Sequence, residues 1–426
     1  MFTAIQAKID KIFDENRFLF VAIFWLLSRL AILLAMMLIA PALPEPRNGI
    51  IPTPGWDVFS AWDSEWYYEI ATEGYSYSDD GLQHSVAFFP LFPLLVRGIM
   101  TIGFPFAIAG PLVNNLAFFG AMLLVCNWVE ELYDKRAAKW TIAVMAFCPF
   151  SLFGTVAYTE GLFLLLSTAT LRAFQKQQYS WAAIYGALAT ASRPPGIVLI
   201  PTLLIVAWQE RRPLIAYLVS LLTGSGVLAY SLFCWIEFAD PLAFIHAQRA
   251  WQPEEGTFHG WDWVKLLIKA TTGHPTLNFN WLEDPWYPLL FLLICLAFYW
   301  LWRSRSRLGA VKSQYGVCFL GFLLWLRGGT PMLNATSMFG GGYLLWHLRS
   351  QLKPILLVYG FCSLGLILSG GVAMSPGRLV YGIVSLIIAL GLLLARYPRV
   401  GYLTLVFFTY LLGRLAIRFA QHLWAG

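Results

Sequence analysis

Long runs of apolar residues, separated by short polar connections, dominate this sequence. The first run spans 18–40, and similar runs follow it along the chain. A helix that crosses a membrane needs roughly 20 predominantly apolar residues, and the longer runs meet this requirement. Only 12% of the 426 residues are charged, whereas an ordinary soluble domain carries about 25%. The sequence therefore predicts an all-α polytopic membrane protein and excludes disorder, a collagen-like fold and nucleic-acid binding.

We expect about thirteen spans within a single membrane domain that covers residues 1–426. After 18–40, these spans lie near 106–129, 138–156, 158–174, 181–193, 195–209, 214–237, 286–302, 314–327, 332–348, 354–373, 379–395 and 400–420. Lys8, Lys11 and Arg17 precede the first run, and their positive charge places the N-terminus in the cytoplasm. The first run is too long for a cleaved signal peptide, and no small-residue cleavage site follows it.

Basic residues are concentrated in alternate connections of this pattern. They cluster at 135–139, 211–212, 303–312, 349–353 and 396–399. Because basic loops stay in the cytoplasm, these connections are predicted to be cytoplasmic and the loops between them to face outward. The six cysteines all fall in apolar stretches without metal-ligand spacing, which predicts small buried side chains rather than disulfides or a metal site.

Two long loops, at about 41–86 and 239–285, lie on the predicted outer side. Together they contain 14 of the 23 acidic residues, and the second loop contains three of the six histidines. Aqueous chemistry is therefore expected on the outer face. Both loops are rich in Trp and Tyr, which suit a membrane surface, and pieces such as 261–270 fit short interfacial helices.

The densest polar segment of the first loop is 62–75. On a helix, Asp63, Tyr67 and Ile70 would share one face. A second face would hold Glu65, Glu69 and Glu73, and such a stripe is typical of a solvated surface. Asp63 directly follows Trp62. From spacing alone, Asp63 fits equally a general base flanked by aromatic residues and a structural role as a helix N-cap or a helix-start charge.

Several ionisable residues lie close to predicted membrane depth. They are Glu160, Arg193, Arg327 and Arg378. Charges inside a membrane are costly, so each one suggests a function. The three arginines fall at the outer ends of predicted spans, where a guanidinium can bind a lipid phosphate through its planar fork. The alternative is snorkelling to the interface, which we favour for Arg327.

A shorter apolar run at 87–103 contains two prolines three residues apart, Pro90 and Pro93. These prolines should prevent a regular helix at the start of the run. We therefore expect a half-buried or re-entrant helix, whose free carbonyls must be covered by other protein. His84 lies at the mouth of this run and fits a surface histidine.

Several short motifs along the chain are typical of one enzyme family. Two early motifs are the most specific: Trp62-Asp63-x-x-x-Tyr67-x-x-Ile70-Ala71-x-x-Gly74-Tyr75 and Ala87-Phe88-Phe89-Pro90-Leu91-Phe92-Pro93. Three later stretches are Ala157-Tyr158-Thr159-Glu160-Gly161-Leu162-Phe163, Pro241-Leu242-Ala243-Phe244 with Ala247-Gln248 and Trp251, and Arg418-Phe419 with Trp424-Ala425. With these motifs the chain resembles the PIG-V family of mannosyltransferases, which adds the second mannose of GPI anchors in eukaryotes and has bacterial relatives.

The resemblance implies a GT-C-type fold and an inverting transfer from a polyprenyl-phosphate sugar. An acidic residue of the first outer loop serves as the base in such enzymes, and Asp63 stands at that position. The residues expected to bind substrates are Trp62, Tyr67, His84, Glu160, Arg193, Gln248, Trp251 and Arg378. A late Ser-Met-Pro-Arg-Tyr-like segment of the family is matched by 374–381 with altered spacing, which makes Arg378 a candidate phosphate ligand.

We therefore predict an integral membrane glycosyltransferase that moves a mannose or related hexose to a lipid or glycan acceptor on the outer or luminal face. Asp63 would take the acceptor proton, and Arg193 or Arg378 would stabilise the leaving lipid phosphate. The expected partners are the polyprenyl-phosphate sugar, the acceptor and membrane lipids, and no nucleic acid. The sequence has no Gly-rich nucleotide loop, and we expect no cofactor and no essential metal.

Two alternatives remain open at this point. A lipid or solute transporter would also be polytopic, although such proteins often contain internal repeats and none is evident here. A related transferase would use another sugar, such as glucose or aminoarabinose. The chain has no clear eukaryotic targeting extension, which predicts a bacterial plasma membrane rather than the endoplasmic reticulum and an acceptor other than a GPI precursor.

Overall fold

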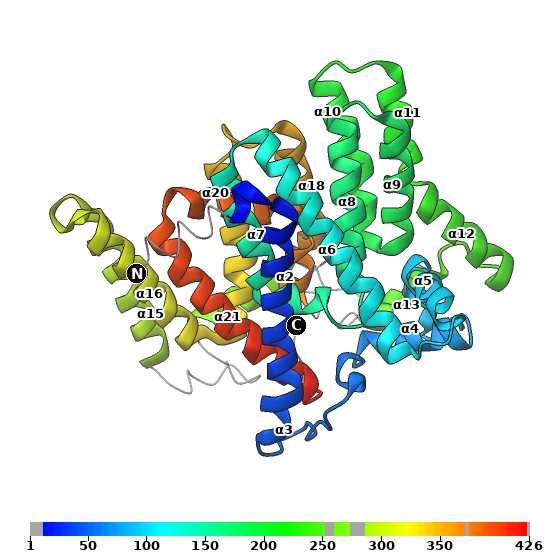
Figure 1. Ribbon diagram of the computed structural model, residues 1–426, viewed down its shortest axis with the longest axis horizontal. Helices are drawn as coiled ribbons and strands as arrows, with labels where there is room; N and C mark the ends of the chain where they lie inside the picture. The colour runs from blue at the N-terminus through cyan, green and yellow to red at the C-terminus, as the bar shows by residue number, and fades with distance from the viewer. Residues whose placement is uncertain (1–11, 252–259, 273–285, 371–374, 424–426) are drawn as a thin grey trace.

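Figure 1 shows a bundle of α-helices of unequal length that cross one another at varied angles. This computed structural model describes residues 12–251, 260–272, 286–370 and 375–423. Within those ranges every regular element is helical and no strand occurs. The predicted all-α fold class is therefore confirmed.

Successive α-helices lie in the first part of the described chain, up to the start of the second long loop. They are α2 (Arg17–Leu34), α3 (Ala40–Ala42), α4 (Asp63–Thr72), α5 (Leu91–Met100), α6 (Phe106–Leu132), α7 (Lys135–Phe147), α8 (Glu160–Gln175), α9 (Tyr179–Ser192), α10 (Leu199–Gln209), α11 (Leu214–Leu222), α12 (Ser225–Phe238) and α13 (Ala243–Gln248). The second half contains α14 (Gly260–Thr272), α15 (Trp286–Arg303), α16 (Arg305–Ala335), α17 (Gly341–His347), α18 (Pro354–Ser369), α19 (Pro376–Tyr381), α20 (Val384–Arg396) and α21 (Pro398–Ala420).

Six helical segments of the described chain are long and apolar enough to cross a membrane. They are Arg17–Ala42, Phe106–Leu132, Leu214–Phe238, Trp286–Arg303, Arg305–His347 and Pro398–Ala420. Shorter apolar helices accompany them at Leu91–Met100, Pro194–Gln209, Pro354–Ser369 and Val384–Arg396. The chain is thus a multi-pass membrane protein, and the expected count of about thirteen spans is not confirmed.

The predicted span 138–156 shows how an apolar run can differ from a single helix. The α-helix α7 ends at Phe147, and a 3-10 turn follows at Pro149–Gly154. Proline disfavours the helical conformation in the residue before it, and Cys148 accordingly has ψ of 137°. The chain therefore passes from α7 to α8 through a buried segment that is not α-helical, and this segment lies beside the charged site described below.

The proline-containing run 87–103 is more regular than expected. A 3-10 turn at Ser85–Ala87 precedes α5, which begins immediately after Pro90 and contains Pro93 in its first turn. The first residues of a helix have no intrahelical partner for their N–H groups, so proline is tolerated there. The prolines thus start the helix instead of interrupting it. The predicted interfacial helix at 261–270 corresponds to α14.

The packing core surrounds α6, which packs against α8, α7 and α2. Buried aromatic side chains such as Phe118, Trp128 and Phe174 fill the space between these helices. Of the six cysteines, which are all free, Cys126 and Cys234 are buried, whereas Cys295 is exposed on the apolar surface of α15. The prediction that all six are buried was therefore wrong, because a lipid-facing helix surface can also accept a thiol.

Two ends of the bundle differ in what they contain. The helices α4, α5 and α13 gather at the lower right of Figure 1, whereas the α10–α11 connection, with Arg211 and Arg212, lies at the top. The first long loop and the start of the second are therefore neighbours, on the side opposite this basic connection.

Candidate functional site

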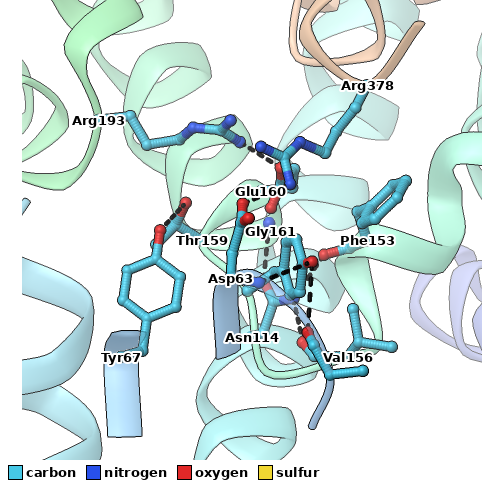
Figure 2. Close-up of polar contacts among 12 residues, drawn as sticks. Asp63, Tyr67, Asn114, Phe153, Val156, Thr159, Glu160, Gly161, Arg193 and Arg378 are labelled. Carbon is cyan, nitrogen blue, oxygen red and sulfur yellow. Dashed lines mark hydrogen bonds and ion pairs between the residues drawn. The ribbon is translucent and has the colours of Figure 1, made fainter. Parts of the chain in front are cut away.

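Four charged side chains from separate parts of the sequence meet at the first turn of α4. Arg378 Nη1 lies 2.6 Å from Asp63 Oδ2, and Arg378 Nε lies 3.2 Å from Glu160 Oε1. Arg193 Nη1 lies 2.6 Å from the same Glu160 oxygen. Figure 2 shows the two guanidinium groups converging on Glu160, with Asp63 beside it. We call Asp63, Glu160, Arg193 and Arg378 the charged quartet.

The members of the quartet differ sharply in their access to solvent. The exposed fraction of the side chain is 1% for Glu160 and 10% for Arg193. It is 16% for Arg378 and 25% for Asp63. The quartet is therefore a buried ion-pair network that opens at Asp63. Burial would lower the pKa of the Arg378 guanidinium, but the carboxylates of Asp63 and Glu160 raise it above its ordinary value.

Asp63 is the first residue of α4, and its carboxylate points to Arg378. The N-cap position belongs to Trp62, which makes no side-chain capping bond and has φ of 60°. The Asp63 N–H donates to the Tyr158 hydroxyl at 3.3 Å, and the Ser64 hydroxyl donates to the Ala157 carbonyl at 3.2 Å. The N-cap interpretation of Asp63 is therefore wrong, because Trp62 holds that position. The carboxylate of Asp63 does lie in the first turn of α4, as the helix-start interpretation expects.

A buried asparagine of α6 fixes the start of α8 and with it Glu160. Asn114 Nδ2 donates to the carbonyl oxygens of Phe153 at 2.7 Å and Val156 at 2.8 Å. Asn114 Oδ1 accepts the N–H of Gly161 at 2.7 Å, as Figure 2 shows. A Cβ atom at Gly161 would overlap Asn114, so glycine is required there. Sequence reasoning missed Asn114, although a polar amide inside an apolar run is a recognisable signal.

Tyr67 lies behind the quartet and connects α4 to α5. Its hydroxyl is 3.5 Å from Thr159 Oγ1, and its ring packs edge-on against Phe88 and Phe92. Burial raises the pKa of the Tyr67 hydroxyl, and the charge of Asp63 adds to the effect. Tyr67 is thus a neutral, buried neighbour of the charged groups.

His84, Gln248 and Trp251 belong to a separate region around the segment 84–89. His84 Nε2 lies 2.7 Å from Asp80 Oδ1, and Gln248 Nε2 donates to the Ala87 carbonyl at 3.4 Å. Trp251 packs against Phe88 and against Trp66 of α4. In the described part of the chain, none of these three side chains contacts the quartet. Phe88 provides the connection, because it also touches Tyr67.

A second polar cluster joins the two long loops and was not expected. The Tyr77 hydroxyl donates to Asp240 Oδ2 at 2.9 Å, and His246 Nδ1 lies 2.7 Å from the same oxygen. Burial raises the pKa of Asp240, but hydrogen bonds from the Leu242 N–H, His246 and Tyr77 outweigh it and leave this pKa below its ordinary value. We call Tyr77, Asp240 and His246 the loop clasp.

The glutamate stripe and Arg327 lie away from the quartet. Glu65 and Glu73 are exposed, in line with a solvated face, and Glu69 accepts a hydrogen bond from the Ser76 hydroxyl at 3.0 Å. The Arg327 guanidinium lies over the ring of Tyr287. These residues therefore do not extend the site.

The segment that supplies Asp63, Glu160 and Arg193 has known relatives. Residues 53–217 match the family model described as Mannosyltransferase (PIG-V). The resemblance predicted from the motifs is confirmed over this PIG-V segment. Arg378, Gln248 and Trp251 lie outside it, so their roles depend on the geometry alone.

Two relatives show the extent of the similarity. GPI mannosyltransferase 2 of Drosophila melanogaster is 26% identical over 165 residues, which cover 32% of this chain and 36% of that protein. GPI alpha-1,6-mannosyltransferase 2 of Homo sapiens is 27% identical over 150 residues, which cover 33% of this chain and 29% of that protein. The match to the PIG-V relatives thus spans about a third of their length.

Two solved structures are similar to this chain along most of its length. The archaeal oligosaccharyltransferase AglB from Archaeoglobus fulgidus, in complex with an inhibitory peptide and a dolichol-phosphate, matches 97% of this chain and 56% of its own at 14% identity and a TM-score of 0.47. ArnT from Cupriavidus metallidurans, bound to undecaprenyl phosphate, matches 93% of this chain and 78% of its own at 11% identity and a TM-score of 0.39.

Proposed function

We propose that this chain is an integral membrane glycosyltransferase of the GT-C type. It would move a mannose or related hexose from a polyprenyl-phosphate sugar to the hydroxyl of a lipid or glycan acceptor, with inversion at the anomeric carbon. One observation supports this most strongly. Asp63, a partly exposed carboxylate of the PIG-V segment, contacts the guanidinium of Arg378, and Arg378 shares Glu160 with the buried guanidinium of Arg193. A carboxylate beside two neighbouring guanidinium groups is the combination that transfer from a phosphate-linked sugar requires.

In the proposed reaction Asp63 is the general base. The acceptor oxygen attacks the anomeric carbon from the side opposite the phosphate and forms the new glycosidic bond as the bond to the phosphate oxygen breaks. The acceptor proton passes to the Asp63 carboxylate. Asp63 suits this role because it is the most exposed member of the quartet and because its backbone N–H is bonded to Tyr158.

The arginines of the quartet would bind the lipid phosphate. The bond electrons leave with the phosphate, whose negative charge increases as it departs. Arg193 and Arg378 both reach Glu160 Oε1, so their guanidinium groups lie side by side. Two such donors in a buried site stabilise a developing phosphate charge through charge-assisted hydrogen bonds.

Tyr67, Trp62 and the region around Phe88 would bind the sugar and the acceptor. Trp62 precedes the base directly, and Tyr67 lies beneath the quartet. Gln248 and Trp251 contact the segment 84–89 from the second outer loop, and His84 lies at the start of that segment. We place these residues along the path of the acceptor, on the outer face of a bacterial plasma membrane.

A transporter is the alternative proposal, and the PIG-V match argues against it. The decisive experiment removes the gene from its host and compares envelope lipids and glycans by mass spectrometry. One hexose-bearing species should disappear and return when the wild-type gene is restored. An unchanged envelope, together with no consumption of polyprenyl-phosphate mannose by the purified protein, would contradict the proposal.

Asp63→Asn tests the proposed base directly. Asparagine keeps the shape of the side chain but cannot accept the proton, so turnover should fall by roughly a hundredfold or more. The rate of donor consumption and the restored hexose-bearing species both report this change. Glu65→Gln is the matched control, because Glu65 lies on the exposed face of the same helix and its substitution should leave turnover near the wild-type rate. An active Asp63→Asn enzyme would exclude the catalytic role.

A further inference from the structure

The charged quartet is electrically neutral without any substrate. Two guanidinium groups face two carboxylates: Arg378 contacts both Asp63 and Glu160, and Arg193 contacts Glu160. A sugar phosphodiester adds one negative charge to this balanced site. The proposed function requires the arginines to bind that phosphate. The phosphate must then compete with a carboxylate that is already paired with a guanidinium.

Glu160 is poorly suited to release its arginine partners. Its side chain is 1% exposed and lies within ion-pair distance of both arginines through one oxygen. It opens α8, whose first turn is bonded to Asn114 through the Gly161 N–H. A carboxylate this deeply buried has no water to replace its partners, and an unpaired buried charge is strongly destabilising. Glu160 should therefore stay between the arginines.

Asp63 is the carboxylate that can leave. It contacts one arginine, Arg378, whose Nη1 lies 2.6 Å from Asp63 Oδ2. Its side chain is a quarter exposed, so a released carboxylate reaches the outer aqueous side. Ion pairs with this much solvent access are weak compared with buried ones, and a lipid phosphate can displace them.

We propose that Arg378 exchanges partners when the donor binds. The donor phosphate displaces Asp63 from Arg378, while Glu160 acts as a positioning residue that keeps Arg378 and Arg193 together. This inference rests on the proposed function. The same guanidinium thus holds the base in the empty enzyme and the phosphate in the loaded enzyme.

The exchange would also activate the base. The charged and titratable groups around Asp63 are Tyr67 on α4, Tyr158 before α8, Glu160, Arg193 and Arg378. Before exchange the Asp63 carboxylate is paired with the Arg378 guanidinium. After exchange it has lost that partner and is free to accept a hydrogen bond from the acceptor hydroxyl. Asp63 is therefore available as a base only when a donor is in place, and its return to Arg378 helps to release the spent lipid phosphate.

The exchange predicts a result that is not expected if Asp63 acts as a base without competing with the phosphate. If Asp63 competes with the phosphate, then Asp63→Asn, which removes the competing charge, should bind a lipid phosphate more tightly while it loses turnover. We expect the dissociation constant for farnesyl phosphate, a short polyprenyl phosphate, to fall about fivefold, as for the loss of one partly exposed ion-pair competitor. Asp63→Ala removes the same charge without an amide and should tighten binding in the same direction.

The experiment uses the full chain in lipid nanodiscs and measures farnesyl phosphate binding by calorimetry. Glu65→Gln, on the exposed face of α4, should bind as the wild type does. In Arg378→Gln the extra effect of Asp63→Asn should vanish, because the shared guanidinium is gone; this double-mutant cycle isolates the coupling.

Unchanged or weaker binding in both Asp63 variants overturns the exchange. If these variants also lose turnover, the proposed function stands and only the exchange is wrong. If they keep turnover, the catalytic role of Asp63 fails as well. Wild-type protein that does not bind farnesyl phosphate at all would overturn both the exchange and the proposed donor class.

Discussion

Glu160 is the residue on which the charged quartet depends for stability. Its oxygen contacts two arginines inside the protein, and removal of one partner from a buried ion pair costs about 3 kcal/mol or more. Glu160→Gln should therefore lower the free energy of unfolding by about that amount, measured by denaturant titration of the purified protein. Glu131→Gln provides the control, because the ion pairs of Glu131 with Arg172 and Lys176 lie on a 42% exposed side chain and contribute about 1 kcal/mol or less. Equal losses in the two variants would contradict a buried role for Glu160.

Arg193 should affect donor use even though its ion pair is with Glu160 and not with Asp63. Arg193→Ala removes one of two proposed phosphate donors from a site where its side chain is 10% exposed. The catalytic efficiency for the donor should drop by roughly tenfold or more. Arg193→Lys should restore part of it, because the ammonium keeps the charge but lacks the planar fork. Steady-state kinetics with polyprenyl-phosphate mannose give the answer, and normal kinetics in Arg193→Ala would remove Arg193 from the phosphate site.

The loop clasp joins the first outer loop to the connection before α13, and its pH dependence follows from two shifted groups. The pKa of Asp240 is lowered from 3.8, so its contribution to stability is complete above about pH 4 and is lost as the pH falls through the lowered value. Burial and the hydrogen bond to Asp240 raise the pKa of Tyr77 from 10.0 to about 12. Its contribution is therefore complete below about pH 10 and is lost as the pH rises through about 12.

We accordingly expect the clasp to stay closed from about pH 4 to pH 10 and to open on either side of that range. Spin labels at Leu82 and Glu237, two exposed positions on the joined segments, would report the opening as a longer and broader distance distribution. Asp240→Asn should weaken the clasp throughout this range. A clasp that opens near neutral pH in the wild type would show that neither Asp240 nor Tyr77 controls it.

The sequence predicts the positions of helices better than the breaks between them. Apolar runs locate helices such as α6 and α21, because a membrane penalises unpaired backbone groups in any other conformation. The break at 149–154 is less visible. The carbonyls of Phe153 within it and of Thr155 just after it accept hydrogen bonds from Asn114 and Asn115 of α6. Such long-range partners leave no periodic pattern in the segment that they stabilise.

For the site as well, the sequence indicates individual residues but not their partners. The cost of a charge in an apolar setting singles out Glu160, Arg193 and Arg378 one at a time. Their pairing with Asp63 depends on how α4, α8, α9 and α19 pack, which spacing along the chain does not specify. Gln248 and Trp251 belong to motifs that resemble those of the same family, and His84 lies just before another such motif. All three nevertheless lie around a neighbouring segment and not at the quartet.

For the whole molecule, the predicted orientation can be tested by labelling. The first outer loop and the α15–α16 connection should lie on opposite sides of the membrane, since the basic cluster at 303–312 favours the cytoplasm. In a cysteine-free background, a cysteine at Ser78 should react with a membrane-impermeant maleimide in intact cells, and one at Ser304 should react only after permeabilisation. Labelling of Ser304 from outside would invert the protein and place the quartet on the cytoplasmic side.

Gly377, which precedes Arg378, has a consequence for the recognition of related genes. A Cβ atom at this position would overlap the ring of Phe150, so α19 can bring Arg378 to Asp63 only if its neighbour has no side chain. The Tyr381 hydroxyl meanwhile donates to the Met145 carbonyl at 2.7 Å and holds the other end of this short helix. A genome search for chains with the same charged site should therefore use the dipeptide Gly-Arg followed by tyrosine three positions later as its fingerprint. Chains with arginine after a bulkier residue would have to build such a charged site on a differently placed helix.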